Sequence, residues 1–171
     1  MDIDHTFTEK GTIDVTLGES MAVKFLEQME RYCNSTRLPF IVKGILSKRD
    51  ALLCKDIGAA GLVISHHGGR LAYAAPPAMM LPEIREAVGA DMKIFVDCGI
   101  ASGMDAYKAM ALGADAVSVG NHLIEYLRKG QTEACADRMA AMTEELRGAM
   151  AYTGVMDCRI SDPTVIHGRD F

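Results

Sequence analysis

The chain has 171 residues, of which 49% are hydrophobic, and a formal net charge of −5 at pH 7, which fits one domain (residues 1–171) with a real apolar core. The absence of a basic run and of a long apolar span argues against a nucleic-acid-binding or membrane-spanning protein. The five cysteines are odd in number and form no Cys-x-x-Cys pair; together with the lack of a signal sequence, they predict a cytoplasmic protein with reduced thiols and no metal site.

The N-terminal part predicts the end of a strand, a loop and a helix. Residues 1–5 alternate between apolar and polar side chains, as at the end of a strand, and residues 6–18 are polar. Apolar side chains at helical spacing then predict an amphipathic helix over residues 20–33.

Strands and helices alternate in the rest of the chain. Four short apolar runs predict strands over residues 39–43, 61–65, 93–97 and 115–119. Helices are predicted over residues 47–57, from Pro76-Pro77 to Val88, and over residues 104–112, 123–128 and 132–152. Short connections between alternating strands and helices are typical of parallel β/α units with right-handed crossovers.

An internal repeat narrows the fold class. Residues 57–65 align without gaps with residues 112–120, and each segment holds a helix end, a glycine, a small residue and a buried strand. Such repetition favours a (β/α) barrel over a doubly wound sheet. Because a whole barrel needs about 250 residues and eight units, the four units and the strand end predicted here indicate half a barrel.

The region after the second predicted strand combines groups that suit catalysis. The apolar run stops at Ser65 and is followed by His66, His67, two glycines and Arg70. Ligands of parallel α/β folds bind at the carboxyl ends of the strands. We therefore predict His67 as a general base and Arg70 as the partner of a carboxylate. The alternatives are a structural histidine and a surface arginine on an exposed loop.

Other polar side chains stand at the ends of other strands. Lys43 follows the first full strand and would hold a positive charge at the barrel mouth, where it stabilises negative charge on a cofactor or substrate. Asp4 could orient a histidine, His5 is a further base, and Asp97 could bind a sugar hydroxyl group. For each of them, a solvated or structural role is the alternative.

Glycines follow the last two predicted strands. Phosphate sites in barrels lie after the seventh and eighth strands, where loop amides and a helix N-terminus converge. Gly99, Gly103 and Gly120 would let the backbone approach a phosphate, and Ser102 could add a hydroxyl group. Ordinary turns are the alternative interpretation of these glycines.

Together these motifs resemble the FMN-dependent α-hydroxy acid oxidase and dehydrogenase family, which includes glycolate oxidase, lactate oxidase and flavocytochrome-type lactate dehydrogenases. The resemblance covers residues 1–166 and implies a TIM barrel. This chain would supply its C-terminal half, the end of strand four and strands five to eight. The segments that carry the resemblance are Leu38–Gly44, Ser65–Arg70, Asp97–Ile100 and Ala111–Gly120.

The resemblance also implies roles for individual residues. His67 corresponds to the histidine that takes a proton from the 2-hydroxy acid, Asp4 to the aspartate that supports it, and Arg70 to the arginine that binds the substrate carboxylate. Lys43 corresponds to the lysine beside the flavin ring. FMN contacts are implied at Lys43, Ser65, Asp97, Gly99, Ser102, Gly103, Gly120 and Asn121.

The sequence departs from the family where arginines usually follow the Asp-Gly-Gly motif and the glycine of the last strand. Ala101, Ser102 and Asn121 stand at these places. Loss of these charges weakens phosphate binding, because charge-assisted hydrogen bonds are about twice as strong as neutral ones.

Three functional hypotheses remain open at this stage. The first is an FMN-dependent oxidoreductase that converts a small, lactate- or glycolate-like 2-hydroxy acid to the 2-keto acid, completed by a second copy or by a complementing half-barrel. The second is a truncated, non-catalytic half-barrel. The third is half of an aldolase- or isomerase-type barrel, in which Lys43 would form a Schiff base.

Overall fold

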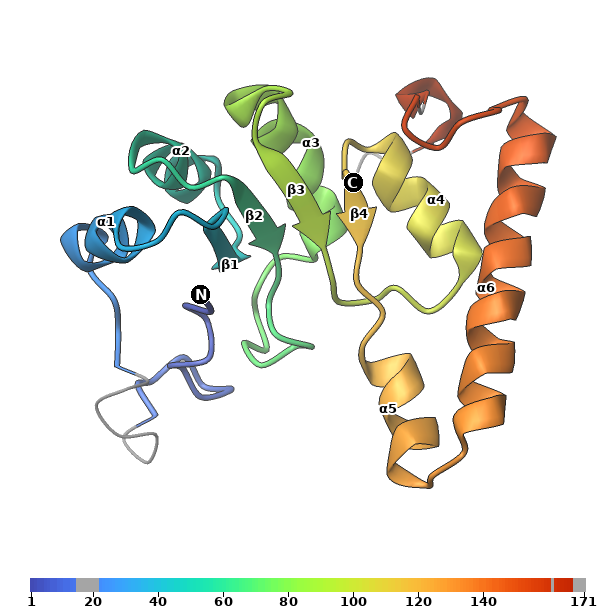
Figure 1. The fold of residues 1–171 in the computed structure, drawn as a ribbon, viewed down its shortest axis with the longest axis horizontal. Coiled ribbons are helices and arrows are strands. Elements are labelled where there is room, and N and C mark those ends of the chain that lie inside the picture. Colours follow the sequence, from blue (N-terminus) through green and yellow to red (C-terminus); the bar gives the residue numbers. More distant parts are fainter. Residues whose placement is uncertain (15–21, 161, 168–171) are drawn as a thin grey trace.

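A parallel four-stranded sheet forms the centre of the computed structural model, which describes residues 1–14, 22–160 and 162–167. The strands follow one another in the order β1-β2-β3-β4 (Figure 1). They are β1 (Ile41–Ile45), β2 (Gly61–Ile64), β3 (Lys93–Val96) and β4 (Ala116–Val117). The predicted parallel β/α succession is therefore confirmed. The last strand has two residues where five were predicted.

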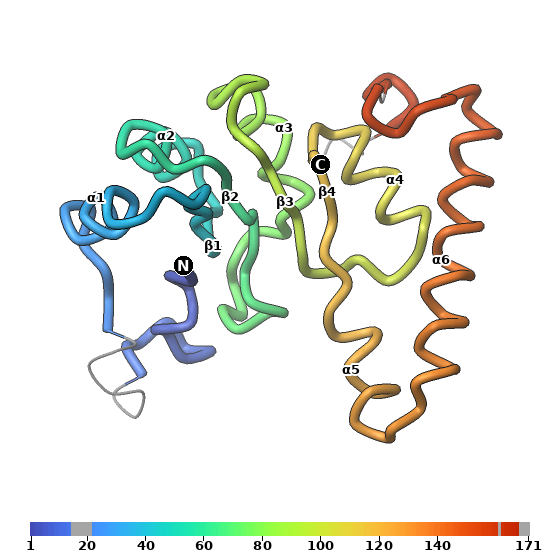
Figure 2. Tube along the Cα trace, viewed as in Figure 1, coloured from blue at the N-terminus to red at the C-terminus, as the bar shows by residue number. Residues whose placement is uncertain are grey.

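A helix follows each strand. The helices are α1 (Leu26–Asn34), α2 (Lys48–Asp56), α3 (Pro77–Val88), α4 (Gly103–Ala111), α5 (Asn121–Arg128) and α6 (Thr132–Thr153), and a 3-10 turn spans Pro163–Val165. Helix α6 runs alongside α4 and forms a hairpin with α5 (Figures 1 and 2). None of the helices in the described part of the chain is long and apolar enough to cross a membrane.

The first helix is shorter than predicted. It begins at Leu26, and Phe25 is its N-cap residue, whose backbone amide donates to Gln28 Oε1 over 3.0 Å. The side chain of Phe25 is 67% exposed. It therefore does not pack into the core in a way that would extend the helix toward residue 22. The predicted start at Ser20 lies outside the described residues.

The core lies between the sheet and its covering helices. Val42, Leu62 and Ile94 pair across the sheet and are fully buried, as are Leu81 and Ile84 of α3. Burial of such side chains contributes roughly 1.5–3 kcal/mol each. The alternation of side chains along a strand places the next residues on the opposite face.

That opposite face of the sheet is open. Lys43, Val63, Phe95 and Ala116 form the next row across the four strands, and all four are only partly buried. In a closed barrel this row would point into the interior. The arrangement is that of a partial barrel, as predicted.

The N-terminal segment lies beside β1. Asp2 forms an isolated parallel bridge with Lys43, and the Ile3 amide donates to the Lys43 carbonyl over 2.9 Å. The Lys43 amide in turn donates to the Met1 carbonyl over 2.8 Å. The predicted strand end is thus present, and it brings Asp2, Asp4 and His5 to the carboxyl end of β1.

Candidate active site

The loop after β2 turns sharply to present His67. The backbone of His67 has φ 54°, in the left-handed region that favours glycine but that histidine, asparagine and aspartate also enter. The buried hydroxyl of Ser65 accepts a hydrogen bond from the His67 amide over 3.1 Å and fixes this turn. Ser65 therefore supports the loop from within the core.

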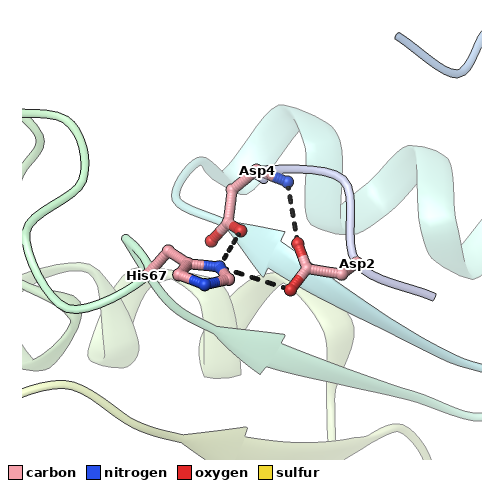
Figure 3. Close-up of side chains that lie close together, drawn as sticks. All are labelled: Asp2, Asp4 and His67. Atoms are coloured by element: carbon pink, nitrogen blue, oxygen red, sulfur yellow. Dashed lines mark hydrogen bonds and ion pairs between the residues drawn. The ribbon is translucent and has the colours of Figure 1, made fainter. Parts of the chain in front are cut away.

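His67 faces two carboxylates of the N-terminal segment (Figure 3). Its Nδ1 lies 2.8 Å from Asp4 Oδ1 and 3.3 Å from Asp2 Oδ2. Carboxylates accept hydrogen bonds, so in the neutral ring a hydrogen on Nδ1 matches both partners and the lone pair lies on Nε2. The structure thus brings His67 and Asp4 together as predicted and leaves Nε2 as the basic nitrogen.

Lys43 is the positive centre of this cluster. Its Nζ lies 3.3 Å from Asp2, 3.5 Å from Asp4 and 3.8 Å from Asp97. Partial burial on its own would lower the pKa of Lys43, but the charges of Asp4, Asp2 and Asp97 outweigh it and raise the pKa. Lys43 is therefore a fixed ammonium group.

Asp2, Asp4 and His67 offer ligand atoms within 4.8 Å of one another, a spacing that could hold a metal ion. The ammonium of Lys43 lies 3.3 Å from His67 Nδ1 and beside both carboxylates. It supplies the positive charge that a cation would bring, so the geometry gives no reason to add a metal.

The two carboxyl groups differ in their environment. Burial raises the pKa of Asp4, and the shared hydrogen bond with Asp2 acts in the same direction. Burial also acts to raise the pKa of Asp2, but its hydrogen bond with Asp4 and the charge of Lys43 lower it to about 2. Asp2, which the sequence analysis did not single out, is therefore the more firmly ionised of the pair.

A second histidine contacts the other side of the His67 ring. His5 Nδ1 lies 3.3 Å from His67 Nε2, and the ring centroids are 4.7 Å apart. The sequence did not predict Asp2 and His5 as partners of His67, although both lie within two residues of Asp4.

Arg70 lies on the same loop as His67 but already has partners. Its Nη2 pairs with Asp14 Oδ2 at 3.2 Å, and its Nε donates to the Phe7 carbonyl. His67 and Arg70 line one open cavity of about 440 Å³ together with residues of the 8–14 segment. His67 and Arg70 thus lie close together, as predicted. The carboxylate that Arg70 binds in this structure is that of Asp14.

A second cavity, of about 220 Å³, opens beside Lys43 and His67 at the ends of β3 and β4. A Cβ atom added at Gly99 or Gly120 would meet nothing within 4 Å, so both glycines border open space. The first amides of α5, from Asn121 onward, lie at its edge. The residues that line it include Lys43, His67, Asp97, Cys98, Gly99, Gly120, Asn121 and His122.

Three of the predicted cofactor residues lie outside this cavity: Ser65, which is fully buried beneath the His67 turn, and Ser102 and Gly103. The Ser102 hydroxyl caps α4 by accepting from the Asp105 amide over 3.1 Å, and the Gly103 amide donates to Glu145 Oε2 over 2.7 Å. A Cβ at Gly103 would collide with the backbone of α6. Both residues thus serve the packing of α4 on α6, because carboxylates already occupy this helix N-terminus.

Cys98 links the two loops that border the cavity. It has φ 63°, and its Sγ donates to Asp97 Oδ1 over 2.8 Å and accepts from the Gly68 amide over 3.1 Å. Burial raises the pKa of this thiol, which suits a structural contact better than a reactive one. The contact holds Asp97 in place at the cavity.

The sequence model of the FMN-dependent dehydrogenase family matches residues 7–167. The chain belongs to this family. FMN is the cofactor that membership assigns, and oxidoreductase chemistry on a TIM-barrel scaffold is the family's general character. The predicted resemblance is confirmed.

Proteins similar to this chain include oxidases whose names give a 2-hydroxy acid as the substrate. The chain is 45% identical to the L-lactate oxidase of Alicycliphilus denitrificans over 76% of its own length and 35% of the relative. It is 39% identical to 2-hydroxyacid oxidase 1 of Mus musculus over 77% of its own length and 36% of the relative. The chain thus spans about a third of these relatives.

Solved structures confirm the partial barrel. A mandelate oxidase variant with a monooxide FMN adduct matches 90% of this chain at 37% identity and a TM-score of 0.79, but only 49% of that oxidase is covered. The structure with benzoyl-formic acid matches 78% of this chain and 40% of the oxidase at a TM-score of 0.74. The chain corresponds to about half of each barrel.

The cavity fits one side of a flavin mononucleotide. Two glycines border open space, the first residues of α5 line the cavity, and Asp97 offers acceptors for hydroxyl groups. Typical ligand pockets measure 300–1,000 Å³, so about 220 Å³ is the volume of a partial site. The residues present fit the cofactor.

Proposed function

We propose that this chain supplies the proton-abstracting half of an FMN-dependent oxidoreductase that converts a small, lactate- or glycolate-like 2-hydroxy acid to the 2-keto acid. The observation that carries the proposal is the 2.8 Å contact between His67 Nδ1 and Asp4, next to the glycine-bordered cavity. This contact leaves His67 Nε2 free of a hydrogen and ready to accept one.

In the proposed reaction, His67 Nε2 takes the proton of the substrate 2-hydroxyl group. The two carboxylates at Nδ1 stabilise the imidazolium that results. When bound, FMN would supply the acceptor for the hydride equivalent. Lys43 lines the same cavity as His67, and its fixed positive charge would stabilise negative charge that develops there.

The remaining residues bind and orient. The glycine backbone at Gly99 and Gly120, with the first amides of α5, would hold the phosphate of the cofactor, and Asp97 would accept hydrogen bonds from its hydroxyl groups. Arg70 is proposed to bind the substrate carboxylate. Because the guanidinium is 24% exposed and paired with Asp14, the substrate must compete with Asp14 for it.

The open sheet face and the small cavity indicate that the site is completed by other strands. We propose that they come from a complementing half-barrel or from a second copy of this chain. The residues of the row from Lys43 to Ala116 would then line a closed interior.

The Schiff-base alternative is disfavoured by the charge of Lys43. A nucleophilic amine needs a neutral nitrogen, as in lysines whose pKa is lowered by burial or a neighbouring cation. Lys43 instead has three carboxylates within 4.0 Å and a raised pKa.

The non-catalytic alternative is favoured by one observation, that the chain covers about a third of its curated relatives. A titration with FMN, followed by flavin fluorescence and by molar mass in solution, separates the two readings. The enzyme proposal expects saturable binding, and anaerobic addition of L-lactate or glycolate should then bleach the flavin. If no flavin binds with FMN in large excess, the enzyme proposal is contradicted and the non-catalytic fragment is the hypothesis that stands.

A further inference from the structure

Two consecutive residues contact both nitrogens of the same imidazole ring. Asp4 lies against Nδ1 of His67 at 2.8 Å, and His5 Nδ1 lies 3.3 Å from Nε2. The two imidazole planes are tilted by 59°. The proposed base is therefore held on both sides by one short segment.

The hydrogen positions of this pair follow from the carboxylates. The ionised forms of Asp2 and Asp4 only accept hydrogen bonds, so in the neutral ring of His67 a hydrogen on Nδ1 matches them and leaves the lone pair on Nε2. Two facing lone pairs at 3.3 Å would repel each other. With a neutral His67, the contact is attractive when His5 Nδ1 carries a hydrogen and donates it to His67 Nε2.

The backbone fixes His5 in this position. The amides of Asp4 and His5 both donate to Asp2 Oδ1 over 3.2 Å, which closes a tight turn. The groups around the pair are Asp2, Asp4 and Lys43 on the Nδ1 side of His67. His5 is the residue at Nε2.

We infer that His5 is a positioning residue that caps the reactive nitrogen of His67 in the substrate-free site and yields it to the substrate hydroxyl group. The role of Nε2 in this inference rests on the proposed function. No bond is broken in the capped state. When the substrate O–H replaces the His5 N–H as the donor to Nε2, the proton can pass to His67.

Histidine tautomers test the pairing in the chain as it is. Long-range ¹H–¹⁵N correlations at pH about 8, where ordinary histidines are neutral, report which ring nitrogen carries hydrogen. We expect His5 to carry it on Nδ1, the less common form for a free imidazole. In His67→Asn, which suits the positive φ of this position, His5 should revert to the tautomer of exposed His167. A wild-type His5 with its hydrogen on Nε2 would overturn the inference.

Chemical access to the base provides a second readout. Diethyl pyrocarbonate acylates an imidazole nitrogen that has a free lone pair. We expect its reaction at His67 to be several-fold faster in His5→Asn than in the wild type, with His167→Gln as the matched control that leaves the rate unchanged. Equal rates at His67 in His5→Asn and the wild type would refute the cap. Neither readout requires flavin binding or turnover, so both can succeed even if the proposed reaction fails.

Discussion

The two sides of the candidate site are built on different principles. The side formed by the N-terminal segment, β1 and β2 is dense in charge, with Asp2, Asp4, Lys43 and His67 within hydrogen-bonding or ion-pair distance. The side formed by the loops after β3 and β4 offers glycine backbone, helix amides and Asn121. Under the proposed function, the comparison assigns the groups for proton transfer to this chain, whereas the glycine side has few charges of its own with which to hold FMN.

The largest effect is expected on the charged side, from His67→Asn. Loss of a general base typically lowers the rate about 10²–10⁴-fold, whereas the backbone turn should survive because asparagine accepts positive φ. The rate of flavin reduction by L-lactate measures this, with bound FMN as the check of an intact site. His66→Asn is the matched control, since His66 Nδ1 only accepts from the Gly69 amide. Equal losses of rate in both variants would contradict the role of His67 as the general base.

Lys43→Met should destabilise the fold by about 2 kcal/mol, because it leaves the buried carboxylate of Asp4 without its cation. The urea midpoint measures this change. Addition of Asp4→Asn should restore part of the loss, since the unpaired charge is then gone. Lys93→Met is the control: Lys93 is 60% exposed and its partner Asp115 also binds Arg85, so less than about 0.5 kcal/mol is expected. Equal losses would contradict a central role of Lys43.

On the glycine side, Asn121→Arg should tighten FMN binding by about tenfold, the value of one charge-assisted hydrogen bond of roughly 1.4 kcal/mol. Riboflavin, which lacks the phosphate, should bind unchanged. Quenching of flavin fluorescence measures both affinities, and exposed Gln131→Arg serves as the control for net charge. An equal gain for riboflavin would mean that residue 121 does not face the phosphate.

The smallest effect is a change in acid sensitivity on the charged side. The folded pKa of Asp2 is lowered from 3.8 to about 2, so its ionised form stabilises the fold above about pH 4, and this contribution is lost as the pH falls through 2. Asp2→Asn should therefore be less stable than the wild type at pH 6, with the difference vanishing near pH 2. Thermal unfolding at a series of pH values measures it. A difference independent of pH would assign the effect to packing instead.

The order and type of the elements were predictable because the apolar runs and glycine stops are local signals. The strand at Gly61–Ile64 and the helix that ends before Gly58 follow directly from them. The start of α1 was not predictable from apolar spacing, since Gln28 caps the helix at Phe25. The placement of residues 15–21 lies outside the described part of the chain.

Site residues at the carboxyl ends of neighbouring strands were easier to predict than those whose role is set by a distant helix or by a polar loop. His67 and Asp4 come together because both stand at strand ends of neighbouring chain segments. Gly103 reads as a phosphate-binding glycine, but its role is set by α6, about forty residues further on, whose Glu145 takes its amide. The partner of Arg70, Asp14, lies in a polar loop with no periodic signal that would identify it.

The short edges of the sheet have a consequence for how this chain behaves before its barrel is complete. An exposed strand edge is a template for aggregation, and short edge strands are one way in which proteins avoid it. One edge of this sheet is covered by the bridge at Asp2, and the other consists of the two residues of β4. The described strands therefore offer little unpaired backbone to a neighbouring chain, which disfavours fibrillar stacking along the sheet even though one face of the sheet is open.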